Sequence, residues 1–154
     1  MDDENKIRSG YTRWEAEVGA IYDLVRAAPR VVFQEAGFLL VEPEMVLRIL
    51  TEVNLAVAGC RHIMDTDSIR HIIKSHAGAK ELRRGQIPLV REDFLLLPKV
   101  FSSPDTIANV GKTKPGRDTI CYKKVIGEYR YCYFEELRTK KNRLAAVTYY
   151  EKKQ

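Results

Sequence analysis

The chain has 154 residues, of which 45% are hydrophobic, enough to build the core of one domain and too many for wholesale disorder. No apolar run approaches the roughly 20 residues of a membrane helix, and the acidic N-terminus is unlike a signal peptide. The cysteines Cys60, Cys121 and Cys132 lack CxxC spacing. We therefore expect reduced thiols in a cytoplasmic protein, with no disulfide framework and no zinc site.

The formal net charge of +5 is unevenly distributed along the chain. Residues 1–60 carry a net charge of −4, whereas residues 61–154 carry +9. This asymmetry predicts an acidic helical segment over residues 1–59 and a basic domain over residues 60–154. Such a domain favours a polyanionic partner, with nucleic acid as the first choice. The alternative is a lysine-rich surface that serves only solubility.

The acidic segment is predicted to contain two or three helices. Ile7 to Ala28 carries apolar residues at steps of three and four, and Pro29 ends this pattern. Arg30 to Val41 is compatible with a helix or with an extended piece. Glu44 to Ala58 is again helical in pattern, with Gly59 as its end.

The most distinctive stretch begins the basic domain. Cys60 to Met64 is predicted as a short strand, and the polar run from Asp65 to Ser68 offers N-caps for a helix over Ile69–His76 that ends before Gly78. At about 100° per residue, one side of this helix carries isoleucines and His76, while the other side carries His71 and Lys74. A histidine on an apolar face is also compatible with a purely structural role.

The C-terminal half changes to a period of two. A helix over Glu92–Val100 and a turn at Ser103–Asp105 lead to four strands, predicted at Thr106–Val110, Thr119–Ile126, Glu128–Leu137 and Leu144–Tyr150. Their short connections predict an antiparallel meander. The fold class is therefore α+β, with N-terminal helices followed by a sheet of about four strands and the histidine helix packed on it.

The sequence lacks the motifs GxxxxGK[ST], GxGxxG and HExxH, and carboxylates are sparse in the basic half. We therefore expect no cofactor and no metal, and consider metal-independent chemistry on a phosphodiester. That chemistry needs an acid and a base, for which histidine is suited, and cations for the charge of the transition state. The candidate cations are Lys74, Arg91, Lys123, Lys124 and Arg130.

Strict alternation assigns these strand residues to faces. Lys123 lies opposite Lys124, which shares its face with Tyr122, and the next strand has Tyr129, Tyr131 and Tyr133 on one side with Arg130, Cys132 and Phe134 on the other. In the last strand Ala146, Thr148 and Tyr150 share a face, opposite Val147 and Tyr149. Tyrosines spaced by two are typical of cross-strand packing. On a basic sheet they are also used to bind single-stranded RNA, which makes Tyr122, Tyr129 and Tyr131 candidate RNA contacts.

The order of these parts resembles a known family. The segments IRHIIKSHAG, QIPLVREDFLLLPKVFSSPDTI, ICYKKV, YRYCYFEEL and RLAAVTYY resemble the phage-associated branch of the barnase–EndoU–colicin–RelE superfamily of nucleases, over about Cys60 to Tyr150. The resemblance implies helices before a four-stranded antiparallel sheet with the active groove on the sheet. It also implies a metal-independent ribonuclease, often a toxin.

By position in that resemblance, the catalytic roles fall to His76 or His71 on the helix, to Lys123 or Arg130 on the middle strands, and to Thr148 or Tyr149 near the end. The expected substrate is RNA, and the expected protein partner is an antitoxin or immunity protein. The alternatives are a non-catalytic nucleic-acid-binding module or a protein-interaction module of a phage or mobile element. The sequence does not indicate the RNA target or the oligomeric state.

Overall fold

The computed structural model describes residues 3–28, 30, 32–76 and 85–154, with side chains described from residue 9 onward. Its helices are α1 (Asp3–Ala27), α2 (Pro43–Val53), α3 (Thr66–His76), α5 (Arg91–Leu95) and α6 (Leu97–Ser102), with a 3-10 turn η1 (Thr139–Lys141). Its strands are β1 (Glu35–Leu40), β2 (Arg61–Asp65), β3 (Gln86–Ile87), β4 (Thr106–Lys112), β5 (Asp118–Ile126), β6 (Tyr129–Arg138) and β7 (Arg143–Lys153). The predicted stop at Gly78 lies outside the described residues.

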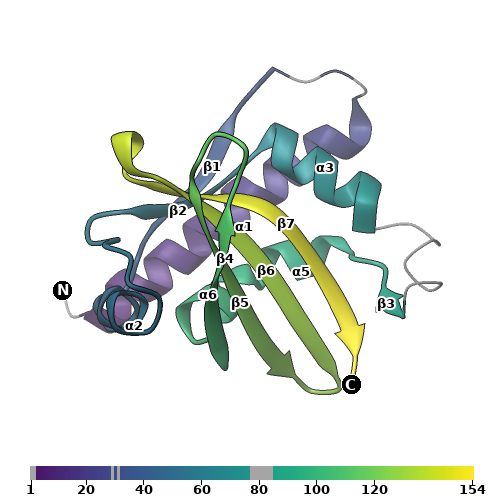
Figure 1. Ribbon diagram of the computed structural model, residues 1–154. Helices are drawn as coiled ribbons and strands as arrows, with labels where there is room; N and C mark the ends of the chain where they lie inside the picture. Colours follow the sequence, from purple (N-terminus) through teal and green to yellow (C-terminus); the bar gives the residue numbers. More distant parts are fainter. Residues whose placement is uncertain (1–2, 29, 31, 77–84) are drawn as a thin grey trace.

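The strands form one sheet in the order β1-β2-β7-β6-β5-β4, and β3 pairs with the outer edge of β7 (Figure 1). All of these pairings are antiparallel except that of β2 with β7, which is parallel. The predicted α+β class and the meander from β4 to β7 are confirmed. The prediction did not foresee that β1, β2 and β3 extend the sheet, because their pairing partners are remote in sequence.

One face of the sheet is covered by helices. Figure 1 shows α1, α5 and α6 behind β5, β6 and β7, and no helix of the described chain crosses the front of these three strands. Aromatic rings fill the interface. The ring centroids of Phe101 of α6 and Tyr133 lie 6.1 Å apart, and those of Phe94 of α5 and Tyr149 lie 6.0 Å apart. We call this side the core face and the opposite side the open face.

Among the described residues, no helix has the length and apolar composition that crossing a membrane requires.

The long helix α1 joins the two parts of the chain. Trp14 is fully buried and donates a hydrogen bond from Nε1 to the carbonyl of Phe94, 3.0 Å away. Its ring also fixes the path of β1, because a Cβ at Gly37 would lie 2.4 Å from it. Gly37 has φ of 97°, which other residues rarely adopt. The division at residue 59 stays a prediction of the sequence, and β1 pairs with β2 across it.

Two predicted helices differ from the structure. The helix expected to reach Ala58 ends at Val53, because Asn54 adopts a left-handed conformation (φ 57°) and its N–H bonds to the carbonyl of Leu50. The single helix expected over Glu92–Val100 is two short ones, α5 and α6, with Leu96 between them. Pro98 lies in the first turn of α6, where its missing N–H costs no helical bond.

A buried polar contact connects β2 to β6 over the intervening strand β7. Nδ1 of His62 lies 2.9 Å from both carboxylate oxygens of Glu135, and both residues are at most 1% exposed. His62 pairs with Leu144 of β7 and Glu135 pairs with Ala146, so the contact crosses β7. The His62 ring also stacks on Phe101 at 3.7 Å. This contact therefore joins two strands and α6 inside the core.

The two partners of this contact should contribute to stability in a coupled, non-additive way. His62→Ala leaves the Glu135 carboxylate buried without its partner, and we expect it to lower the free energy of unfolding by about 3–5 kcal/mol. The double variant His62→Leu/Glu135→Leu should lose less than His62→Ala and Glu135→Ala combined, because no unpaired charge remains. Urea unfolding of the four proteins measures this. Additive losses would contradict the coupling.

A second buried group lies where α5 meets β7. Asp93 is 6% exposed and accepts a hydrogen bond at Oδ2 from the N–H of Val90, 2.8 Å away, which caps α5. Glu151 is 4% exposed, and burial together with the charge of Asp93 raises its pKa to about 7. Burial also raises the pKa of Asp93, and the repulsion between two buried like charges disfavours ionisation of both groups.

This pair predicts that stability falls as pH rises. Below pH 4.5 Glu151 is protonated in both states; between 4.5 and about 7 only the native state keeps the proton, so the free energy of unfolding decreases. Glu151→Gln mimics the protonated acid and should be more stable than wild type at pH 8 by about 1–3 kcal/mol. Thermal and urea unfolding from pH 4 to 8 measures the difference. The exposed Glu128→Gln is the control, and equal profiles for both variants would contradict the prediction.

Candidate active site

The position of α3 is fixed at its start by reciprocal hydrogen bonds. Oδ1 of Asp65 accepts from the N–H of Ser68 at 2.7 Å, and the N–H of Asp65 donates to Oγ of Ser68 at 3.1 Å. This is a capping box with serine at its third position, and both residues are buried. At the other end, the carbonyl of His76 accepts from the N–H of Leu89 at 2.9 Å. The helix is therefore held at both ends, with His76 in its last turn.

His76 reaches the sheet at Tyr150. The two ring centroids lie 5.8 Å apart with an interplanar angle of 42°, and both side chains are partly buried. The predicted apolar side of α3 is confirmed, since Ile69 and Ile72 are fully buried and His76 follows them on that side. His71 and Lys74 lie on the exposed side of the same helix. The structure thus separates the two candidate histidines: His76 contacts Tyr150 of β7, whereas His71 is exposed.

Tyr150 points to the open face because β7 contains a bulge. Phe134 pairs with Thr148, whereas its neighbour Glu135 pairs with Ala146, so Val147 is the additional residue. The strict alternation predicted for the last strand is therefore wrong after Ala146. Thr148 and Tyr150 lie on the open face, and Tyr149 turns into the core.

The neighbouring strands add cations to the same face. Lys123 pairs with Cys132, which pairs with Tyr150, and one step along Arg130 pairs with Lys152. Lys123 and Arg130 are exposed. Nζ of Lys152 lies 5.5 Å from the centre of the Tyr150 ring. Lys152 therefore contacts the Tyr150 ring, and Arg130 and Lys123 lie on the same face of the next two strands, β6 and β5.

The electrostatics of this group keep the Tyr150 hydroxyl protonated. Burial, followed by the charge of Cys132 and a hydrogen bond to its thiol, raises the pKa of Tyr150 to about 12, although Arg130 acts in the opposite direction. Burial also raises the pKa of Cys121, to about 11. At neutral pH the site thus offers a phenolic donor beside an imidazole and several fixed positive charges.

Five other candidates are held on the core face or against the helices. Tyr149 is fully buried and donates its hydroxyl proton to the carbonyl of Asp93 at 2.9 Å. Tyr122 is fully buried and Tyr131 is 6% exposed. Lys124 donates to the carbonyl of Ser103, and Arg91 forms two hydrogen bonds with Asp23 of α1. We leave these five out of the candidate site. Tyr129, at the end of β6, is 36% exposed.

Two residues of the candidate site, Tyr150 and Lys152, were not among the predicted catalytic or RNA-binding residues. Tyr150 was assigned a face by alternation, and the resemblance pointed to its neighbours Thr148 and Tyr149. Lys152 lies beyond the predicted end of the last strand, which extends to Lys153. The bulge that brings Tyr150 to this face depends on the pairing of β7 with β6, which the sequence of β7 alone does not indicate.

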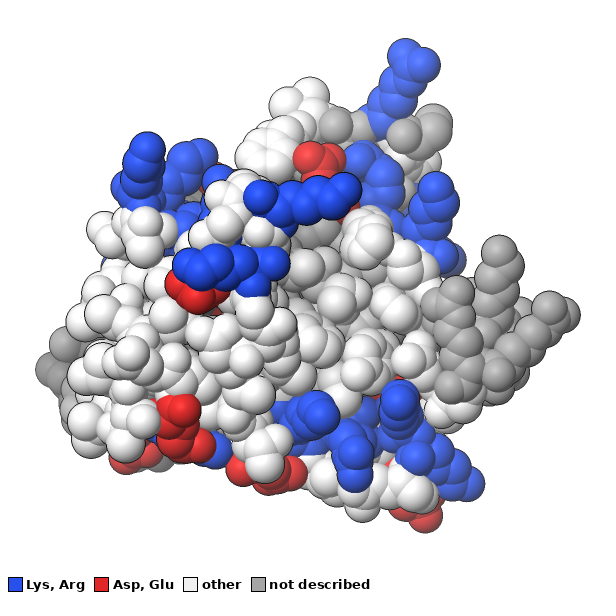
Figure 2. All heavy atoms as spheres, viewed as in Figure 1, with Lys and Arg blue, Asp and Glu red and all other residues white. Residues whose placement is uncertain are grey.

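Figure 2 shows the open face directly. Lys and Arg gather at two ends of this view, over the end of the sheet where β5 turns into β6 and over the opposite end, with largely uncharged surface between them. Within residues 3–28, 30, 32–76 and 85–154, no group of three or more His, Cys, Asp or Glu residues is arranged to hold a metal ion.

Comparison with known proteins agrees with the resemblance in the motifs. A family model described as phage-Barnase-EndoU-ColicinE5/D-RelE like nuclease3 matches residues 44–154, from α2 to the last residue. No curated protein and no solved structure matches the chain significantly. Since the family match spans well over half of the sequence, the chain belongs to this phage-associated family of barnase–EndoU–colicin–RelE-like nucleases.

Proposed function

We propose that this protein is a metal-independent ribonuclease whose active site lies on the open face around His76 and Tyr150. The observation that carries the proposal is the contact between these two rings beside Lys123, Arg130 and Lys152. An imidazole and a phenol are groups that exchange protons, and the cations suit a phosphodiester. Thr148, two positions from Tyr150 on the same face, supplies a further hydroxyl.

The charges on this face support an anionic ligand. Arg130 and Lys152 are direct cross-strand partners, and like charges in such positions destabilise a sheet. Within the described part of the chain, neither forms an ion pair, whereas Arg91 on the helix side pairs with Asp23. A phosphate between the strands would remove this repulsion. The arrangement is therefore unfavourable without a ligand and favourable with one.

The proposed reaction is attack of a ribose 2′-hydroxyl on the adjacent phosphorus. The new bond between O2′ and phosphorus replaces the bond to O5′, which leaves as a hydroxyl and gives a 2′,3′-cyclic phosphate. His76 supplies one of the two proton transfers, and Tyr150, which keeps its proton at neutral pH, is available to donate the other. Lys123 and Arg130 stabilise the added negative charge of the transition state.

The test is cleavage of a mixed RNA pool in EDTA. Wild-type protein should cleave RNA and leave DNA of the same sequence intact, because DNA lacks the attacking hydroxyl. His76→Ala should lower the rate by about 10²–10⁴-fold, the usual contribution of a general acid or base. Tyr150→Phe should also lower it, since the ring is kept and only the proton donor is lost. Initial rates of gel-resolved cleavage measure each effect.

His71→Ala is the matched comparison, because it removes an exposed histidine from the same helix and should retain activity. An equal loss in His71→Ala and His76→Ala would argue against the assignment of the proton transfer to His76. A wild-type protein that binds RNA in a salt-sensitive manner and cleaves none of it would contradict the proposal and identify a non-catalytic binding module.

A further inference from the structure

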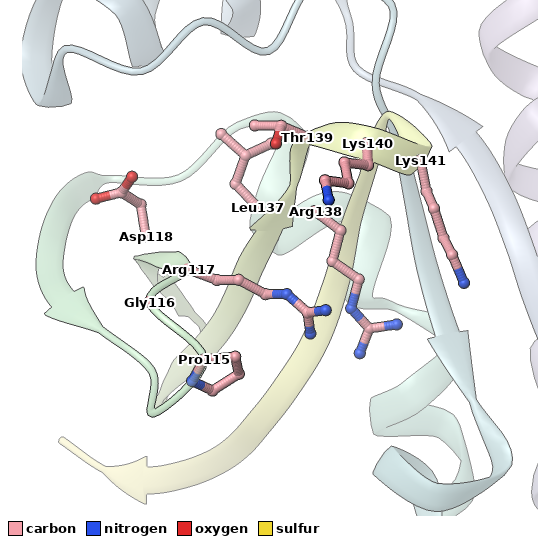
Figure 3. A pocket seen from close by; sticks show the side chains of 9 residues that line it. All are labelled: Pro115, Gly116, Arg117, Asp118, Leu137, Arg138, Thr139, Lys140 and Lys141. Carbon is pink, nitrogen blue, oxygen red and sulfur yellow. The ribbon is translucent and has the colours of Figure 1, made fainter.

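A cavity of about 680 Å³ lies at the opposite end of the strands from Arg130. Figure 3 shows it between two turns, the one that joins β4 to β5 and the one that joins β6 to β7. Four of its nine lining residues are cations, Arg117, Arg138, Lys140 and Lys141. We call this cavity the hairpin pocket. Its two apolar side chains are Pro115 and Leu137, and no aromatic ring lines it.

Two of these cations are held in place by a buried carboxylate. Oε1 of Glu136 accepts hydrogen bonds from Nη1 of Arg117 and from Nε of Arg138, both at 2.9 Å, and Glu136 is 8% exposed. Figure 3 shows the two guanidinium groups side by side. Each guanidinium has five N–H donors and uses one of them here, so most donors remain for a ligand. One carboxylate thus aligns two arginines and neutralises only one of their charges.

The other charges around the pocket leave it basic. Asp118 is the one acid among the lining residues, and Nζ of Lys112 lies 3.7 Å from its carboxylate. Lys140 and Lys141 are exposed on η1, which Asn142 closes in a left-handed conformation. Arg138 also pairs directly with Arg143 across the strands, a second like-charge pair. This surface is therefore prepared for an anion, and the absence of a ring to stack on favours phosphate over a base.

The hairpin pocket is on the same face as the candidate active site. Alternation along β6 places Arg130, Cys132, Phe134, Glu136 and Arg138 on one side, and no register shift between β5 and β6 interrupts it. Arg130 and Arg138 are eight residues apart, roughly 26 Å along the strand. Between them, the partly exposed rings of Phe134 and Tyr150 lie 6.0 Å apart. Basic side chains thus lie at both ends of the open face, and the less charged surface between them carries two aromatic rings.

We propose that the hairpin pocket binds the phosphate backbone of a nucleic-acid strand several nucleotides away from the phosphate at His76. This inference rests on the proposed function in taking the ligand to be a nucleic acid. Arginine binds phosphate through two parallel N–H donors, and the paired guanidinium groups of Arg117 and Arg138 present such donors on one surface. The pocket then contributes affinity for long strands and nothing for short ones.

The experiment measures binding without cleavage. Fluorescence anisotropy of 2′-O-methyl RNA, which lacks the attacking hydroxyl, compares strands of about 4 and about 16 nucleotides. Lys140→Ala/Lys141→Ala should weaken binding of the long strand about tenfold and change that of the short strand less than twofold. For the long strand, the plot of the logarithm of the binding constant against the logarithm of the salt concentration should become less steep by about 1.4, since two phosphate contacts are lost.

The control variant is Arg26→Ala/Lys99→Ala, which removes the same charge from exposed positions on α1 and α6. It should bind both strands as wild type does. Lysines are changed in preference to arginines because the loss of Arg117 or Arg138 would leave Glu136 buried with one partner fewer. Unchanged thermal unfolding would show that the fold is retained.

The inference is overturned by an equal effect of the two double variants, by no effect of either, or by a wild-type protein that does not distinguish long from short strands. Polyglutamate that binds wild type and not Lys140→Ala/Lys141→Ala, with no preference for long RNA, would instead assign the pocket to an acidic protein. Because the strands cannot be cleaved, these results are independent of the ribonuclease assay. If the binding results are as expected and the wild-type protein cleaves no RNA, the proposed ribonuclease function is contradicted and the inference about the hairpin pocket is not.

Discussion

The burial of one face of the sheet is the constraint on which the rest of the structure depends. A strand presents alternate side chains to its two faces, so a helix layer that occupies one face leaves only the other to a ligand. Here the layer is closed by aromatic contacts and by the buried pair His62 and Glu135, which joins β2, β6 and α6. Any group that binds nucleic acid on β5, β6 or β7 therefore has to lie on the open face.

The bulge in β7 decides which of its residues reach that face. Glu135 faces the core with Ala146, and a regular strand would keep Thr148 and Tyr150 on the same side as Ala146. The additional residue Val147 instead exchanges the two sets, which buries Tyr149 and exposes Tyr150 to His76. The single inserted residue thus changes the chemistry of each face, because the Tyr149 hydroxyl is bonded to the carbonyl of Asp93 in the core and the Tyr150 hydroxyl lies on the open face.

This difference shows how far the sequence can predict such a site. The four late strands were predicted from alternation and turn residues, which are local, and so was the side of α3 that carries His76. The bulge depends on cross-strand register, and the strands β1, β2 and β3 depend on partners far along the chain. Alternation assigned Lys123 and Arg130 each to a side of its own strand, but their position on one face of the sheet follows only from the pairing of β5 with β6. The engagement of Arg91 with Asp23 and of Lys124 with Ser103 could not be foreseen.

The cations at the two ends of the open face differ in whether a carboxylate offsets their charge. At the hairpin pocket, Glu136 lies beneath Arg117 and Arg138 and offsets part of their repulsion, so the arginines are ordered with or without a ligand. At the other end Arg130 opposes Lys152, and no carboxylate within the described residues pairs with either. A bound phosphate contributes more binding free energy where two cations lack a carboxylate partner, because it relieves their repulsion in addition to accepting new hydrogen bonds. Under the proposed function, the charge distribution favours tight engagement of one phosphate beside His76 and weaker positioning of the strand at the pocket.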